Sequence, residues 1–425
     1  MPIGIAQAAQ NGSPTSARMF SREGRRSRLN GFMSTSLSGS ALAETVFGAL
    51  QSEVNDAGVR PWRLPETARR YATPALALMA EFTAGVRLRF VTSARTLELD
   101  VTVTRLVQTG QKGPGASAPF VATIDGRPVD RVDLVETSLV HETAEKTYER
   151  GESRRSRVEL TLPEDGDAGE RVVEVWLPQD AGVVLHTLSA DAPLRTAAPI
   201  NAARWLHYGS SISHGGSADS PLGTWPRLAA AELGLDSVSL GFGGNAMLDP
   251  LVARAISRAS ADVITLKVGI NIVGADAMRK RTLIPALHGF IDTIRDGHPR
   301  TPIAVITAIG CPAVETTPGP IRAGSDGKAT GTPREIRPGD GTLTLVETRT
   351  IVAQIIAART ETDSALHLVD GLALLSVDED DRLPDGLHPD QAGYDLMAKR
   401  FAALARDPST EAGKAFAEVL VTRKE

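Results

Sequence analysis

The segment Tyr208-Gly209-Ser210-Ser211-Ile212-Ser213 decides the fold of the carboxy-terminal half, because small residues there join an apolar strand to a helical stretch. The apolar run before it contains Ala203, Trp205 and Leu206. Beyond the segment, apolar strands and helical stretches alternate, which is typical of a parallel sheet with helices on both faces. The sequence therefore predicts a three-layer α/β/α arrangement with strands at 203–208, 236–240, 263–268, 302–308 and 366–369, and with helices near 223–233, 249–258, 280–296 and 343–358.

Two short blocks follow predicted strands and offer hydrogen-bond donors. The block Ser239-Leu240-Gly241-Phe242-Gly243-Gly244-Asn245 is a glycine-rich turn, where a backbone N–H can approach a ligand without a Cβ in the way. The block Val268-Gly269-Ile270-Asn271 places a side-chain amide just past an apolar strand. Because ligand sites in open α/β sheets form at the carboxyl ends of the strands, we expect Ser211, Gly244 and Asn271 to lie close together.

The stretch Leu383-Pro384-Asp385-Gly386-Leu387-His388-Pro389 sets a carboxylate three residues before an imidazole. A serine hydroxyl is a weak nucleophile until a neighbouring base takes its proton. We expect Ser211 to be the nucleophile and His388 the base, since an ordinary imidazole is largely neutral at pH 7. Asp385 would then hold the tautomer of His388 and stabilise the imidazolium. The alternative is that Asp385-Gly386 is only a turn and that His388 only starts a helix.

Nucleophile, glycine, asparagine and histidine in this order resemble the four blocks of the SGNH (GDSL) family of serine esterases and acyltransferases. The resemblance covers roughly residues 203–405 and implies an acyl-Ser211 intermediate. It also implies an oxyanion hole made by the N–H groups of Ser211 and Gly244 and the amide of Asn271. An ordinary tight turn at Gly244 and a helix cap at Asn271 are the alternatives. Two positions depart from the family pattern, because Ser210 and Ile272 stand where aspartate is usual.

The amino-terminal half shows a different pattern, in which apolar and polar residues alternate from about residue 84. Alternation with period two marks half-buried strands, and several short strands in succession favour an antiparallel, jelly-roll-like β-sandwich. A segment rich in proline and alanine then precedes the strand–helix pattern. The predicted organisation is a disordered extension at 1–33, a β-sandwich domain at 34–190, a linker at 191–203, a hydrolase-like domain at 204–410 and a tail at 411–425.

Composition limits the class of protein. The chain has 425 residues, of which 42% are hydrophobic, and a net charge of −5, which gives no basic face for nucleic acid. The single cysteine, Cys311, excludes an intrachain disulfide, and residues 1–18 lack the apolar run of a secretory signal. No stretch reaches the roughly 20 apolar residues of a membrane span. We therefore expect a cytoplasmic protein that needs no membrane, nucleic acid, metal or other cofactor, while its oligomeric state stays open.

The expected reaction is hydrolysis of an ester of a small or glycosylated substrate, a carboxylesterase-like activity. Family members with an added sandwich include bacterial carbohydrate esterases and an acyltransferase that modifies a polyketide antibiotic. Transfer of an acyl or arylacyl group to a hydroxyl of a polyketide or a sugar is therefore the alternative. A non-catalytic carbohydrate-binding protein is the alternative from another class, and it is motivated by Ser210 and Ile272.

Three further residues are candidates for substrate binding, namely His214, Trp225 and Ile272. A cap or solvent position for His214 and core packing for Trp225 are the alternatives. His207 is expected to pack inside its strand.

A dinucleotide fingerprint is matched by Gly241-x-Gly243-x-x-Ala246, with Asp262 at about the expected distance. Asp262 precedes its strand instead of ending one, so an oxidoreductase is disfavoured. The segment rich in glycine and proline from Cys311 to Gly341 is interpreted either as a lid over the site or as a disordered loop.

Overall fold

The computed structural model describes residues 34–115, 117–164, 169–335, 337 and 339–421. The predicted disordered extension at 1–33 lies outside the described residues. Among the residues described, no helix combines the length and the apolar character that crossing a membrane would require.

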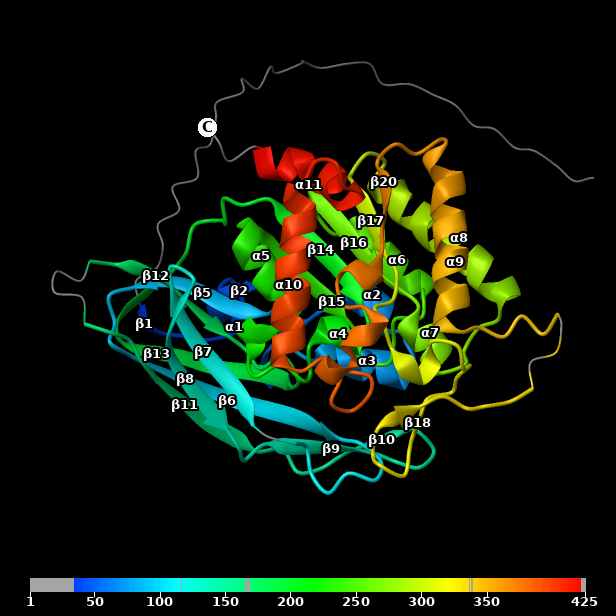
Figure 1. Ribbon diagram of the computed structural model, residues 1–425. Coiled ribbons are helices and arrows are strands. Elements are labelled where there is room, and N and C mark those ends of the chain that lie inside the picture. The colour runs from blue at the N-terminus through cyan, green and yellow to red at the C-terminus, as the bar shows by residue number, and fades with distance from the viewer. Residues whose placement is uncertain (1–33, 116, 165–168, 336, 338, 422–425) are drawn as a thin grey trace, which may run out of the picture. The chain divides into compact units, whose positions relative to one another are not determined.

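The amino-terminal part is built mainly of antiparallel strands, as the alternation predicts (Figure 1). Its strands are β1 (Ser34–Leu37), β2 (Val46–Phe47), β3 (Gln51–Asn55), β4 (Gly58–Trp62), β5 (Arg87–Thr92), β6 (Thr96–Val107), β7 (Ala118–Ile124), β8 (Arg127–Leu134), β9 (Ser138–Glu142), β10 (Tyr148–Arg150), β11 (Arg155–Thr161), β12 (Arg171–Trp176) and β13 (Gly182–Thr196). Three helices accompany them, α1 (Gly39–Ala43), α2 (Glu66–Arg69) and α3 (Pro74–Glu81). One pairing, β6 with β9, is parallel.

The long strand β13 connects two groups of strands. It pairs with β6 over residues 182–190 and with β5 at Arg195 and Thr196. Every second side chain of β6 is apolar, points to the same side and is buried. These residues are Leu97, Leu99, Val101 and Val103. They belong to a hydrophobic core separate from the core of the carboxy-terminal part.

The carboxy-terminal part contains a five-stranded parallel sheet in the order β15-β14-β16-β17-β20, which confirms the predicted fold class. The strands are β14 (Arg204–Gly209), β15 (Asp236–Gly241), β16 (Val263–Lys267), β17 (Ile303–Ile306) and β20 (Leu366–Val369). The longer helices are α5 (Trp225–Leu233), α6 (Pro250–Arg258), α8 (Lys280–Gly297), α9 (Leu345–Thr360), α10 (Gln391–Arg406) and α11 (Glu411–Val421).

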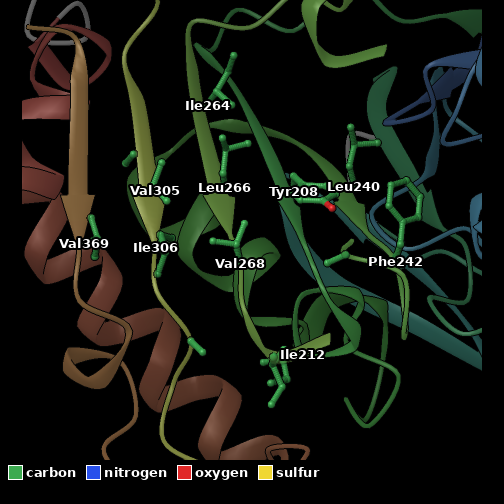
Figure 2. Close-up of a cluster of buried hydrophobic side chains, with 14 of the residues drawn as sticks. Tyr208, Ile212, Leu240, Phe242, Ile264, Leu266, Val268, Val305, Ile306 and Val369 are labelled. Atoms are coloured by element: carbon green, nitrogen blue, oxygen red, sulfur yellow. The ribbon is translucent and has the colours of Figure 1, made fainter. Parts of the chain in front are cut away.

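Helices cover both faces of this sheet. Figure 1 shows α5, α10 and α11 on one face and α6, α8 and α9 on the other. Trp205 of β14 stacks on Phe401 of α10, with 5.1 Å between ring centroids, and Tyr208 of the same strand packs on Phe290 of α8. Apolar side chains from neighbouring strands fill the interior, as Figure 2 shows for Leu240, Leu266 and Val305 among others.

Two element boundaries differ from the sequence prediction. Strand β13 continues to Thr196, so part of the predicted linker is strand. The predicted tail at 411–425 is helix α11 up to Val421. Its apolar residues Ala412, Ala415, Phe416 and Val419 recur at helical spacing and are buried. This face packs into the core, where the ring of Phe416 contacts Trp205 and Phe401.

Candidate active site

Ser211 lies at the junction between β14 and the short helix α4 (Ser211–His214), at the carboxyl edge of the sheet. The hydroxyl of Ser210 accepts a hydrogen bond from the N–H of Ile212 at 3.3 Å and so caps the helix. Ile212 is buried in the core below the junction (Figure 2). A capped turn anchored by a buried side chain holds Ser211 in one position.

The side chains of Ser211, His388 and Asp385 form one hydrogen-bonded chain. Nε2 of His388 lies 2.9 Å from Oγ of Ser211, and Nδ1 of His388 lies 2.7 Å from Oδ2 of Asp385. Asp385 and His388 lie on the loop between β20 and α10, far along the chain from Ser211. The parallel sheet brings them together, because β14 and β20 both end at this edge.

Asp385 is organised to remain ionised. Its Oδ1 accepts hydrogen bonds from the N–H groups of Leu387 and His388, at 2.9 and 2.7 Å. Partial burial opposes ionisation, but the hydrogen bonds from His388 and Leu387 prevail and lower the pKa of Asp385 to about 2. A carboxylate that accepts from Nδ1 leaves Nε2 of the neutral ring free of its proton, so Nε2 can accept the hydroxyl hydrogen of Ser211.

The glycine turn, residues 241–245, adjoins the nucleophile. A Cβ built at Gly243 would lie 3.8 Å from Cβ of Ser211. Gly244 has φ of +67° and open space around it, a conformation that glycine adopts without strain. At Gly241 a Cβ would lie 2.3 Å from the backbone N of His214, so only glycine allows β15 to approach α4 this closely.

Asn271 lies in the first turn of α7 (Ile270–Gly274), directly after β16. Its Oδ1 accepts a hydrogen bond from the N–H of Ala246 at 3.0 Å. This bond orients the amide and leaves its nitrogen as the donor group. The residue at the cap position is Gly269, and the helix has no side-chain cap, so Asn271 is not a helix cap.

The segment from Cys311 to Gly341, in its described residues, is ordered against the loop that carries Asp385 and His388. The N–H of Ala329 donates to the carbonyl of Asp385 at 2.6 Å, and the thiol of Cys311 lies 3.4 Å from the carbonyl of Gly386. A short hairpin of β18 (Arg322–Ala323) and β19 (Ala329–Thr330) presents Ala329 to this loop. These contacts argue against a plain disordered loop.

The three residues expected to bind substrate are buried. Ile272 and Trp225 are fully buried in the core, and Trp225 packs edge-on against Trp205 and His207. His214 is only 2% exposed, so a solvent position is wrong for it. Sequence spacing does not show which side of a short helix faces the core, and this accounts for the error.

His207 packs inside its strand, as expected. Its ring nitrogens lie 2.6 Å from Oγ1 of Thr265 and 2.7 Å from Oγ of Ser213. Burial and the charge of Lys267 lower its pKa to about 3, so the ring is neutral. This neutral ring connects two strands of the sheet to α4 and does not reach the site.

The dinucleotide fingerprint lacks the required geometry. No helix begins in the glycine turn, since α6 starts only at Pro250. Asp262 accepts a hydrogen bond from the N–H of Arg204, at the opposite edge of the sheet from Ser211. Within the described part of the chain, no three histidine, cysteine, aspartate or glutamate side chains gather as a metal site would require.

Residues of the amino-terminal part approach the site, and the sequence gives no signal for them. Sδ of Met79 would lie 3.2 Å from a Cβ at Gly243. Oδ1 of Asp180 lies 3.6 Å from Nε2 of His214. Asp180 also lines a cavity of about 510 Å³, together with Arg105 and Arg131 and with the loop 216–219 that follows α4.

Known proteins resemble both parts of this chain. Residues 207–396 match the model of the GDSL-like lipase/acylhydrolase family. This part of the chain is a GDSL-like domain. Ahead of the GDSL-like domain, residues 45–186 match the N-terminal domain of SsfX3. A search of curated proteins found no match.

Solved structures share both parts. The salicylyl-acyltransferase SsfX3 from a tetracycline biosynthetic pathway is 26% identical, with a TM-score of 0.69 over 86% of this chain and 94% of that chain. The acetyl xylan esterase Est2A from Butyrivibrio proteoclasticus is 12% identical, with a TM-score of 0.53 over 87% and 98% of the chains. A family two carbohydrate esterase from Cellvibrio japonicus is 14% identical, with a TM-score of 0.52 over 88% and 98%. The last two likenesses show a shared fold, and the GDSL-like domain indicates an enzyme that acts on esters.

Proposed function

We propose that this protein is a serine esterase that works through an acyl-Ser211 intermediate, with His388 as general base and acid and Asp385 as its orienting carboxylate. The observation that carries the proposal is the continuous chain from Oγ of Ser211 through the ring of His388 to Asp385, with distances of 2.9 and 2.7 Å. These are hydrogen-bond distances, as the transfer of a proton requires.

The proposed reaction has two steps. Oγ of Ser211 attacks the ester carbonyl while Nε2 of His388 takes the hydroxyl proton. The tetrahedral intermediate collapses, the C–O bond to the alcohol breaks, and His388 returns the proton to the departing oxygen. Water then attacks the acyl-enzyme in the same way and releases the acid and free Ser211.

The oxygen that becomes negative in each step needs donors fixed in advance. We assign this role to the N–H groups of Ser211 and Gly244 and to the amide nitrogen of Asn271. The orientation of Asn271 by Ala246 supports its part in the set. Losing one such donor typically costs about 10² to 10³ in rate.

Transfer to a hydroxyl acceptor is the second candidate. It is favoured by the 26% identity to the salicylyl-acyltransferase SsfX3 over most of both chains. We assign the acceptor to the cavity of about 510 Å³ that is lined by Asp180, Arg105 and Arg131 and adjoins the loop 216–219 after α4. Hydrolysis and transfer use the same groups on Ser211 and differ in whether water or an alcohol reaches the acyl-enzyme.

The test compares the wild-type protein with Ser211→Ala, using acetyl and aryl esters with and without an alcohol acceptor. We expect Ser211→Ala to fold, to lose turnover and to lose covalent labelling by a fluorophosphonate. The neighbouring variant Ser210→Ala should keep most of the activity, because it loses only a helix cap worth about 1 kcal/mol. Turnover that survives in Ser211→Ala would refute the proposal, and an unlabelled but folded wild-type protein would favour the non-catalytic binding protein.

A further inference from the structure

Arg63, a residue of the amino-terminal part, reaches into the GDSL-like domain beneath the glycine turn. It directly follows β4 and is completely buried. A guanidinium has five N–H donors, and each of them has an acceptor here. The acceptors are the carbonyl oxygens of Phe82, Met79, Ser239 and Gly241 and Nδ1 of His214, and none of the five distances exceeds 3.4 Å.

Three of these acceptors belong to the two elements that build the candidate site. Ser239 and Gly241 lie in β15, at the start of the glycine turn. His214 is the last residue of α4, the helix that begins with Ser211. The guanidinium also lies over the ring of Phe242, 4.9 Å from its centroid. One side chain therefore holds the turn that carries Gly244 and the helix that carries Ser211.

Among the described residues, no carboxylate forms an ion pair with Arg63, and the more distant Asp180 favours its charged form. The hydrogen-bond acceptors of Arg63 are carbonyl oxygens and a neutral imidazole. Burial, followed by the charge of Arg63, lowers the pKa of His214 to about 3, so Nδ1 has a lone pair for Arg63. Burial also lowers the pKa of Arg63, to about 9, so the guanidinium stays protonated at pH 7. A buried positive charge beside the glycine turn favours negative charge on the oxygen of a tetrahedral intermediate.

We propose that Arg63 is a positioning residue for the oxyanion hole, by which the amino-terminal part fixes the relative placement of the Gly244 N–H and Ser211. The inference rests on the proposed acyl chemistry at Ser211. It assigns the amino-terminal part a role in the transition state, beyond any contact with substrate. Misplacement of catalytic groups by about 1 Å costs as much as 10² in rate, so the loss of Arg63 should act mainly on kcat.

Arg87 provides a matched control. It is also a buried arginine of the amino-terminal part, with its guanidinium over an aromatic ring, that of Trp176. It donates to Oδ1 of Asp236 at 2.7 Å, at the first residue of β15, whereas Arg63 binds the last. Substitution of either arginine disrupts a buried contact to the same strand, made to a carboxylate by Arg87 and to carbonyl oxygens by Arg63, but only Arg63 holds the end next to Ser211.

The experiment compares Arg63→Lys with Arg87→Lys in the full chain. A lysine keeps the positive charge, but its ammonium group cannot donate hydrogen bonds to five acceptors as the planar guanidinium does. For Arg63→Lys we expect kcat per fluorophosphonate-labelled site to fall about 10- to 100-fold, with KM changed less than about threefold. The inhibition constant of phenylboronic acid, which forms a tetrahedral adduct with the serine, should rise by a similar factor. Arg87→Lys should lower the melting temperature and leave kcat and the inhibition constant as in the wild type.

Equal effects of the two substitutions on kcat, or an unchanged inhibition constant in Arg63→Lys, would overturn the inference. If Arg63→Lys does not fold, His214→Leu removes one acceptor and should weaken boronate binding about tenfold, and unchanged binding would again overturn it. Failure of the proposed function looks different. In that case phenylboronic acid would not inhibit the wild-type protein at all, or Ser211→Ala would remain active.

Discussion

Asp385 uses its two carboxylate oxygens for different purposes. Oδ1 accepts two backbone N–H groups and shapes the turn, whereas Oδ2 accepts from the ring of His388. The turn thus fixes the position of the imidazole as well as its tautomer. This local geometry explains why an aspartate three residues before a histidine is a useful pattern, since the backbone brings the two side chains together without help from distant residues.

The first prediction at this scale compares substitution of His388, which contacts Ser211, with substitution of Asp385, which contacts His388. We expect kcat to fall by roughly 10⁶ in His388→Ala and by roughly 10⁴ in Asp385→Ala, because an imidazole without its carboxylate can still accept a proton. Steady-state and single-turnover assays of the purified variants measure the difference. Asp381→Ala, at a mostly exposed carboxylate nearby, is the control and should behave as the wild type. A larger loss in Asp385→Ala than in His388→Ala would contradict the proposed roles.

The second prediction concerns pH. The pKa of Asp385 is lowered to about 2, so this carboxylate stays ionised well below neutral pH and cannot cause a loss of activity there. Protonation of His388 removes the lone pair that accepts from Ser211, so kcat/KM should fall as the pH is lowered, with a limiting slope of one. The measurement is a single-turnover profile from about pH 5 to 8. A flat profile, with chemistry rate-limiting, would speak against a histidine base.

At the scale of elements, the loop that carries Asp385 and His388 contacts the hairpin of β18 and β19. The N–H of Ala329 donates to the carbonyl of Asp385, so the hairpin braces the loop from outside. A proline at this position has no N–H to donate. We expect Ala329→Pro to lower kcat about three- to tenfold, since a single hydrogen bond is worth about 1 kcal/mol.

Ala329→Gly is the matched control for this brace, because it keeps the N–H and removes only the methyl group. It should retain nearly all of the activity in the same ester assay. Equal losses in the proline and glycine variants would show that the side chain, and not the hydrogen bond, matters. No loss in either variant would leave the hairpin without a role in holding the loop.

Elements were predictable from sequence where one apolar pattern decides them. The strands of the parallel sheet are apolar runs bounded by small residues, and all five appear near their predicted positions. Strands β1 to β4 are only two to five residues long, which is too short for a period to emerge. The helix at 411–421 was not predicted because it is short and two of the four buried residues on its apolar face are alanines.

The residues of the candidate site also fall into two groups, those that a local sequence pattern predicts and those that it does not. Ser211, Asp385 and His388 could be selected because each stands in a short local pattern, and their catalytic roles remain predictions. Arg63 could not be selected, because its acceptors Ser239 and Gly241 are 176 and 178 residues away. No local spacing reports a contact of that range.

For the whole molecule, strand β15 is held at both ends by arginines from the amino-terminal part. Arg87 binds Asp236 at one end and Arg63 binds Gly241 at the other. If one part unfolded alone, these buried charged groups would lose their partners, and an unpaired buried charge strongly destabilises a protein. The two parts should therefore unfold together.

The prediction is a single calorimetric transition for the full chain, with equal calorimetric and van't Hoff enthalpies. A double variant, Arg63→Met with Arg87→Met, should separate this transition into two. A covalent inhibitor bound at Ser211 should shift the wild-type transition upward as a unit. Two transitions in the wild-type protein would contradict the coupling.

The five-donor arginine also limits how the catalytic half can be transplanted. A recombinant cassette that began at residue 204 would contain Ser211, Asp385 and His388 but would lack the donor for the carbonyl groups of Ser239 and Gly241. A foreign module docked over them without such a donor would bury them unpaired, at about 1 to 3 kcal/mol each. A portable cassette would have to begin no later than Gly58, the first residue of β4, so that it carries this strand, Arg63 and Met79 with it. Chimeras that exchange the amino-terminal module for another binding module should therefore keep an arginine at this position, or redesign the strand that it supports.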